Sequence, residues 1–204
     1  MKKRMLKIYV LILTLLLVLI VPGCGEVFRT EVNKSPDDDI SKAIYEAVGR
    51  KKVYYRGKQY NNPGEVAWYE YTVHDYEDEN VLTDMAEAVN AVMKEKEVPE
   101  KIHLGIREKI PGGGGTEGVA SLSNYYESED GCEKYEFLQN LYIHGTEDSS
   151  KGEASPYNKA ATYINLPNIK RLVVTKKIAK NVEEEGIDWY EIWPDLEYYE
   201  VLED

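Results

Sequence analysis

The chain has 204 residues, and its 25 basic and 37 acidic side chains give a formal net charge of −12. Apolar residue types make up 43% of it, which excludes a wholly disordered chain, and the length suits one domain or two small ones. The acidic balance argues against nucleic acid as a partner, because nucleic-acid binding needs a clustered basic surface.

The first 23 residues have the pattern of an export signal. Lys2, Lys3, Arg4 and Lys7 form a basic start, and an apolar run of 14 residues follows over 8–21. As a helix this run spans about 21 Å at ~1.5 Å per residue, whereas a membrane-spanning helix must cross roughly 30 Å of hydrocarbon. The segment therefore fits a signal peptide, and we expect the rest of the chain to lie outside the cytoplasm.

The end of this segment, Val21-Pro22-Gly23-Cys24, resembles the lipobox of bacterial lipoproteins, with Pro22 in place of the family's usual small residue. The resemblance implies that a diacylglycerol is attached to Cys24, that cleavage makes Cys24 the new N-terminus, and that the protein is lipid-anchored at the extracytoplasmic face of the cell membrane. The alternatives are an uncleaved anchor and an ordinary signal peptide.

Removal of the signal would leave 21 basic and 37 acidic residues, a net charge of −16 over 181 residues. Anionic lipid head groups repel such a body, so we expect residues 24–39 to act as a tether and residues 40–204 to form a single globular domain that stands off the membrane. Cys132 would be the only cysteine besides the lipidated one, so no internal disulfide is expected. It lacks basic neighbours in the sequence and is interpreted as structural or incidental.

The first elements of the domain follow from local patterns. Apolar residues at helical spacing predict a helix over 40–48, which begins after the acidic triplet 37–39 and ends at Gly49. Residues 53–60 and 66–73 are rich in Tyr and Val and flank a turn sequence, which predicts two strands.

A second helix and a further strand come next. Leu82, Met85, Ala86, Val89, Val92 and Met93 form an apolar stripe that predicts a helix over 81–97. Alternation at 102–106 predicts a half-buried strand. The four glycines at 112–115 predict a mobile loop, and the Lys-Ser/Thr pair that a phosphate-binding loop needs does not follow them.

Three stretches in the second half share one pattern, with an apolar or aromatic residue at positions 1, 4 and 6. They cover residues 138–143, 169–174 and 196–201, and a weaker copy covers 101–106. The pattern resembles the LxxLxL core of leucine-rich repeats. The resemblance implies an α/β fold, a short solenoid of parallel strands with helical or irregular returns from about residue 98 onward. The alternative is an α+β domain with an antiparallel sheet and packed helices.

If the repeat interpretation holds, seven side chains share the exposed face of these strands and form a candidate binding face: His103, Arg107, Asn140, Tyr142, His144, Arg171 and Tyr198. Tyr and Arg are enriched at binding hot spots. The alternative is a solvated sheet face without a partner.

Other aromatic residues allow a second interpretation. Tyr54, Tyr55, Tyr60, Tyr69, Tyr71, Tyr125, Tyr126 and Trp68 cluster on predicted strands. Such rings can stack on sugars, although tyrosine also packs well on a sheet with its hydroxyl at the surface. Trp189 and Trp193 are expected in the core of the last unit.

Catalytic motifs are lacking. The only histidines are His74, His103 and His144, and neither an HExxH motif, a CxxC pair nor a Gly-x-Ser-x-Gly elbow occurs. We therefore predict no catalytic residues, no metal and no cofactor, and we favour a binding protein with a protein ligand over an enzyme. A glycan-binding module is one alternative, and an envelope hydrolase, which would need a pocket where titratable groups converge, is another.

Overall fold

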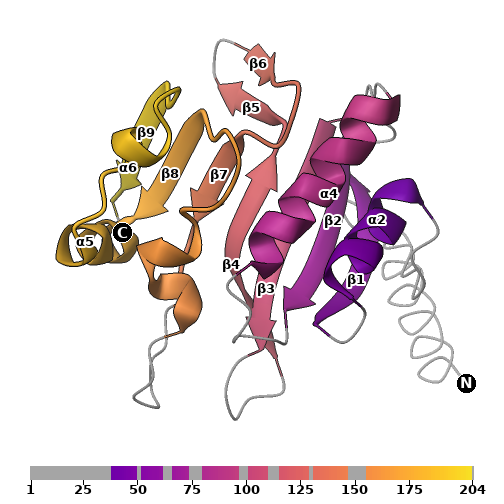
Figure 1. The fold of residues 1–204 in the computed structure, drawn as a ribbon, viewed down its shortest axis with the longest axis horizontal. Coiled ribbons are helices and arrows are strands. Elements are labelled where there is room, and N and C mark those ends of the chain that lie inside the picture. Colours follow the sequence, from indigo (N-terminus) through magenta and orange to yellow (C-terminus); the bar gives the residue numbers. More distant parts are fainter. Residues whose placement is uncertain are drawn as a thin grey trace, which may run out of the picture.

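The computed structural model describes residues 38–49, 52–61, 66–73, 80–96, 101–109, 115–128, 131–146 and 155–203. They form a mixed α/β fold built on an open seven-stranded sheet, in the order β1-β2-β3-β4-β7-β8-β9 (Figure 1). The strands of this sheet are β1 (Val53–Asn61), β2 (Val66–Val73), β3 (Lys101–Lys109), β4 (Thr116–Ser123), β7 (Asn140–Ile143), β8 (Arg171–Thr175) and β9 (Tyr198–Leu202). A separate hairpin consists of β5 (Tyr125–Ser128) and β6 (Gly131–Lys134).

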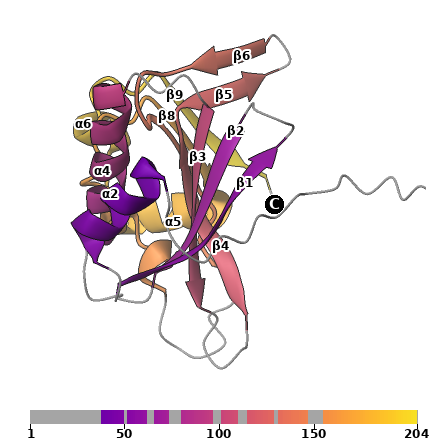
Figure 2. The same cartoon turned by 90° about the vertical axis from the view of Figure 1, so that its right-hand side faces the viewer.

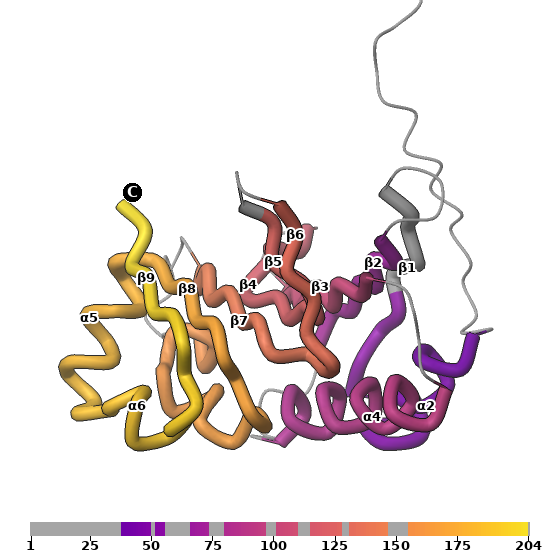
Figure 3. Tube along the Cα trace, turned by 90° about the horizontal axis from the view of Figure 1, so that it is seen from above, coloured from indigo at the N-terminus to yellow at the C-terminus, as the bar shows by residue number. Residues whose placement is uncertain are grey.

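The helices lie on one side of the sheet and the β5–β6 hairpin projects from the other (Figures 2 and 3). They are α2 (Asp39–Val48), α4 (Val81–Lys96), the 3₁₀ helices η1 (Pro156–Asn158) and η2 (Ala160–Thr162), α5 (Lys176–Glu185) and α6 (Trp189–Ile192). We call the side of the sheet away from the helices the open face.

The two predicted helices are confirmed as α2 and α4, and local interactions explain where α2 begins and ends. Asp38 caps α2 by accepting a hydrogen bond from the Ser41 backbone N–H at 2.9 Å. Gly49 ends the same helix with φ 88°, a conformation that glycine adopts without strain. In α4 the predicted apolar stripe is buried except for the partly buried Val92, and Met85 and Val89 are fully enclosed. The strands predicted around 53–60, 66–73 and 102–106 are confirmed as β1, β2 and β3.

The sheet contains both parallel and antiparallel strand pairs. β2–β3, β7–β8 and β8–β9 are parallel, whereas β1–β2, β3–β4 and β4–β7 are antiparallel. Parallel neighbours need a crossover, which α4, the 3₁₀ helices and the α5–α6 segment provide in turn. The antiparallel α+β alternative therefore describes only part of the sheet.

The repeat-like stretches occupy adjacent parallel strands at one end of the sheet. Position 4 is Leu141, Leu172 and Tyr199, and these residues pair directly across β7, β8 and β9. The weaker copy at 101–106 lies in β3, and β4 separates it from β7. Over the described part of the chain the expected solenoid from residue 98 onward is thus replaced by an open mixed sheet, because β4 runs antiparallel between the copies.

One hydrophobic core lies between the sheet and the helices. Alternate strand residues point into it, such as Ile102, Leu104 and Ile106 of β3. Tyr55 and Tyr69 are also buried there, so these tyrosines pack as core residues. No helix among the described residues is long and apolar enough to cross a membrane.

The predicted core role of Trp189 and Trp193 is confirmed. The two rings are buried and stacked, with centroids 4.9 Å apart and planes 3° apart. Cys24, His74, the triplet residue Asp37 and the glycines at 112–114 lie outside the described residues.

Candidate functional site on the open face

Strand register brings distant residues together in rows across the open face. One row takes one side chain from each of six strands: Trp68, His103, Ser123, Asn140, Arg171 and Tyr198. The next row consists of Glu70, Gly105, Ser121, Tyr142, Val173 and Glu200. The second row has small residues at Gly105 and Ser121, between the larger side chains of Glu70 and Tyr142.

These small residues line a cavity of about 470 Å³ on the open face. The Trp68 indole lies over Gly105, Tyr142 lies next to Ser121 on the neighbouring strand, and Tyr125 and Tyr126 of the hairpin add a further wall. The volume is in the range of small-molecule binding sites, and aromatic lining with a few polar groups is their usual composition.

Five of the seven predicted site residues line this cavity: His103, Arg107, Asn140, Tyr142 and His144. Arg171 and Tyr198 follow Asn140 in the first row, on the same face but beside the cavity. The expectation that Arg171 is exposed is wrong, because only 6% of it remains accessible. The hairpin accounts for this, since Tyr126 stacks over the Arg171 guanidinium.

The predicted seven-residue binding face left out several cavity residues. Trp68 and Glu70 come from β2, and Trp68 was named only in the alternative interpretation, among the rings that could stack on sugars. The alternation in β2, with Ala67, Tyr69 and Tyr71 buried, was the available signal. Ser121 belongs to β4, a strand whose small and polar residues gave no strong pattern.

Aromatic pairs stand at both sides of the cavity. The rings of Trp68 and His103 have centroids 4.1 Å apart, and those of Tyr142 and His144 are 4.0 Å apart. Gly105 lets the Trp68 indole lie across β3, because a Cβ at that position would come within 3.2 Å of its Nε1 atom. Glycine at 105 therefore serves the placement of the indole.

The cavity carries little free positive charge at neutral pH. Burial lowers the pKa of His103 to about 4, with a smaller effect of His144, and burial lowers the pKa of His144 to about 4 as well. Arg107 donates hydrogen bonds to the Thr116 hydroxyl at 3.0 Å and carbonyl at 2.7 Å, and its Nη1 lies 3.8 Å from Glu70 Oε1. Both imidazoles are therefore neutral, and the guanidinium is already engaged.

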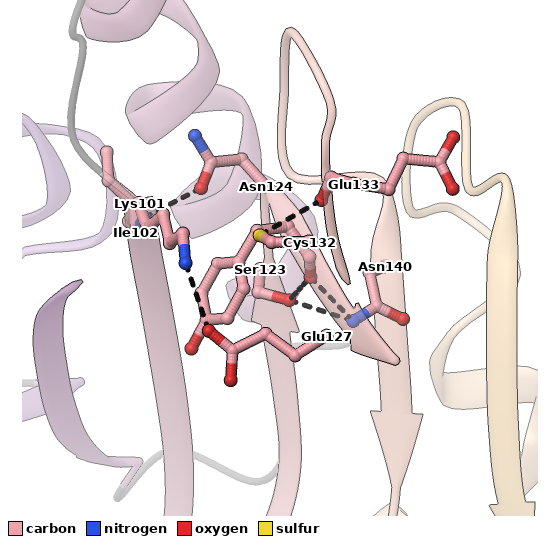
Figure 4. Close-up of polar contacts among 9 residues, drawn as sticks. Lys101, Ile102, Ser123, Asn124, Glu127, Cys132, Glu133 and Asn140 are labelled. Carbon is pink, nitrogen blue, oxygen red and sulfur yellow. Dashed lines mark hydrogen bonds and ion pairs between the residues drawn. The ribbon is translucent and has the colours of Figure 1, made fainter. Parts of the chain in front are cut away.

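The hairpin that walls the cavity is held by polar contacts at its base (Figure 4). Asn140 Nδ2 donates to Ser123 Oγ at 2.9 Å and to the Tyr125 carbonyl at 3.1 Å. Ser123 Oγ also donates to the Tyr125 carbonyl, at 2.8 Å. Asn140, predicted as a contact residue, thus also fixes the start of the hairpin.

A second contact joins the hairpin to β3. Lys101 Nζ donates to Glu127 Oε1 at 3.0 Å, and the pKa of Lys101 is raised by this bond and by Cys132 (Figure 4). Cys132 is an exposed free thiol in β6. It therefore has a basic neighbour in space that its sequence context did not reveal.

The described residues contain no group of three or more His, Cys, Asp and Glu that could hold a metal ion. The carboxylates at the cavity form ion pairs, Glu70 with Arg107 and Glu127 with Lys101.

Comparison of the chain with protein-family models, with curated proteins and with solved structures gives no match.

Proposed function

We propose that the protein is a lipid-anchored binding protein at the extracytoplasmic face of the cell membrane, and that the open-face cavity receives its ligand. The observation that carries the binding role is the convergence of aromatic and polar side chains from β2, β3, β4, β7 and the hairpin on one concave site. The helices leave this face uncovered, so a ligand can approach it (Figure 3). The sequence favours a protein as the partner and leaves a glycan as the alternative, and the cavity could receive either a protein segment or a glycan chain.

The anchor rests on the lipobox-like sequence that ends at Cys24. The expected result is that the native protein partitions into detergent with a lipid on Cys24, as mass spectrometry would detect. Cys24→Ala should be recovered without lipid, and it should leave the membrane fraction. A Cys24→Ala protein that stays membrane-bound, together with an unmodified native Cys24, would refute the anchor.

We also propose that β7, β8 and β9, with their helical returns, form a short leucine-rich-repeat-like segment within the mixed sheet. The direct pairing of position 4 and of position 6 across the three strands supports this proposal. Its consequence is that Asn140, Arg171 and Tyr198 lie side by side on one face of the sheet, with Asn140 in the cavity lining and Arg171 covered by the hairpin.

Binding at the cavity is tested by capture of envelope proteins and glycans on the immobilised domain. Trp68→Ala and Tyr142→Ala should lose the captured partner, because each removes an aromatic wall. Tyr190→Ala is the matched control, since Tyr190 is an exposed tyrosine on α6, on the helical side. Equal capture by all three variants would refute the cavity as the binding site.

A further inference from the structure

We infer that the ligand of the open-face cavity is a neutral saccharide, with a sugar ring seated over Ser121, between the Trp68 indole that covers Gly105 and the ring of Tyr142. This inference rests on the proposed binding function and specifies its ligand class. It depends on the shape of the cavity, its charge, and the position of its strands within the sheet.

The shape suits a flat ring rather than a bulky or elongated apolar group. The Trp68 indole covers Gly105 on β3, and the small side chain of Ser121 on the neighbouring strand β4 leaves space between that indole and Tyr142 on β7. Sugar rings present C–H groups on their faces, and these groups are attracted to the negative faces of aromatic rings. A ring that stacks on Trp68 or Tyr142 would direct its hydroxyl groups toward the edges of the site.

Polar groups lie next to this ring position. Ser121 provides a hydroxyl that donates or accepts, and Glu70 provides carboxylate oxygens that accept. Asn140 offers its Oδ1 as an acceptor, because its Nδ2 is engaged by Ser123 and Tyr125. Sugar hydroxyl groups both donate and accept, so they can form hydrogen bonds with all three side chains. A wholly apolar ligand would displace water from these polar groups without replacing its hydrogen bonds, which is unfavourable.

Charge disfavours an anionic ligand. Arg107 is engaged by Thr116 and Glu70, Lys101 is engaged by Glu127, and the cavity imidazoles are neutral at pH 7. The whole chain is also acidic, with a net charge of −12. A phosphate, a carboxylate or a nucleotide would meet net repulsion at this site.

The position of the cavity over internal strands of the sheet disfavours an extended peptide as its ligand. The cavity lies over β2, β3, β4 and β7, which are all internal strands with neighbours on both sides. Peptides that bind as added strands use the free backbone groups of a sheet edge, and here the edges are β1 and β9. A peptide on the open face would leave most of its own backbone groups without partners from the sheet backbone.

Ser121 offers a clean test because it lies on the cavity floor outside the hydrophobic core. Ser121→Leu should fill the space where the sugar ring would lie, whereas Ser121→Ala should leave that space open. Isothermal titration with neutral glucose and N-acetylglucosamine oligomers, and with uronic-acid oligomers of matched length, measures affinity directly. Thermal unfolding of each variant establishes that it is folded.

We expect a neutral oligomer to bind, with affinity reduced at least about tenfold by Ser121→Leu and by Tyr142→Ala and nearly unchanged by Ser121→Ala. Tryptophan emission should also change on binding, since Trp68 lines the cavity while Trp189 and Trp193 are buried in the core. Preferential binding of the uronic-acid oligomers would overturn the inference. So would the absence of saccharide binding in a protein that captures a polypeptide partner through Tyr142, although that result would uphold the proposed binding function. If neither ligand class binds, the inference and the proposed function both fail.

Discussion

Arg171 of β8 stacks on Tyr126 of the hairpin, with its guanidinium carbon 3.4 Å from the centre of the tyrosine ring. A second ring, that of Tyr198 on β9, lies 3.5 Å from the same carbon. Arginine suits this position because its planar cation can stack on aromatic faces. Arg171 therefore ties the wall of the cavity to the strands at the C-terminal end of the sheet.

Replacement of Arg171 by lysine should loosen the hairpin while keeping the charge. Lysine cannot stack as a plane, so we expect the free energy of unfolding to fall by about 1–3 kcal/mol. Hydrogen exchange of the β5–β6 amides should accelerate. Lys170→Met is the control, since Lys170 forms only an exposed ion pair with Glu197, and it should leave hairpin exchange unchanged. Unchanged exchange in Arg171→Lys would show that the base contacts alone hold the hairpin.

Gly145 and Gly186 have the same φ, so replacing each by alanine compares the cost of a left-handed backbone alone with the cost of that backbone plus a steric clash. Gly145 and Gly186 both have φ 66°, but a Cβ at Gly145 would lie 2.6 Å from Asn158 Oδ1 and 2.9 Å from Ile178 Cδ1, whereas nothing lies within 4 Å at Gly186. Gly186→Ala should cost about 1–2 kcal/mol from the left-handed conformation. Gly145→Ala should cost more, because the added methyl also displaces the hydrogen bond from the Thr146 backbone N–H to Asn158 Oδ1. Urea denaturation measures both, and equal losses would contradict the predicted clash.

The two stacked tryptophans differ in whether the indole N–H forms a hydrogen bond. Trp193 Nε1 donates to the Leu166 carbonyl at 2.8 Å, while the buried Trp189 Nε1 has no hydrogen-bond partner among the described residues. Trp193→Phe should leave that carbonyl without its donor, so its loss of stability should exceed that of Trp189→Phe by about 1–3 kcal/mol. The two rings are buried to a similar extent, at 4% and 3% exposed, so the loss of ring area is comparable. Equal thermal and urea stabilities of the two variants would contradict this role of the Trp193 N–H.

Local patterns predicted the elements of this fold better than their arrangement. The apolar stripe of α4 and the alternation of β3 are properties of short segments, so they could be recognised in the sequence. The position of β4 could not be recognised in this way. Its sequence is rich in Gly, Ser and Thr, and its pairing with β3 and β7 is non-local. This antiparallel strand separates the weaker repeat copy in β3 from β7 and so breaks the expected solenoid.

The candidate face was predictable in part for a similar reason. Alternation fixes which side of its own strand a residue occupies, so His103 and Arg107 were correctly grouped, as were Asn140 and Tyr142. Which residues become neighbours depends on register and on strand order, which local pattern does not fix. The contact of Tyr126 with Arg171 likewise depends on how the hairpin folds back over the sheet.

His103 should make stability fall in mild acid. Its pKa is about 4 in the folded protein, chiefly because burial disfavours the charged imidazolium, and an unfolded histidine has a pKa of about 6.5. Between these values the unfolded chain binds more protons than the folded one, so the free energy of unfolding decreases as pH falls from about 6.5 to about 4 and this contribution is constant below that range. His103→Gln removes the titrating group and should reduce the decrease by at most about 3 kcal/mol over this window, as urea denaturation at a series of pH values would measure. His144 is the control: burial lowers its pKa to about 4 as well, but its side chain is more accessible to water than that of His103, so hydration of the charged form should make the effect of His144→Gln smaller. If His103→Gln and the native protein lose stability in parallel from pH 7 to pH 4, then the imidazole of His103 is hydrated in the folded state and this explanation is wrong.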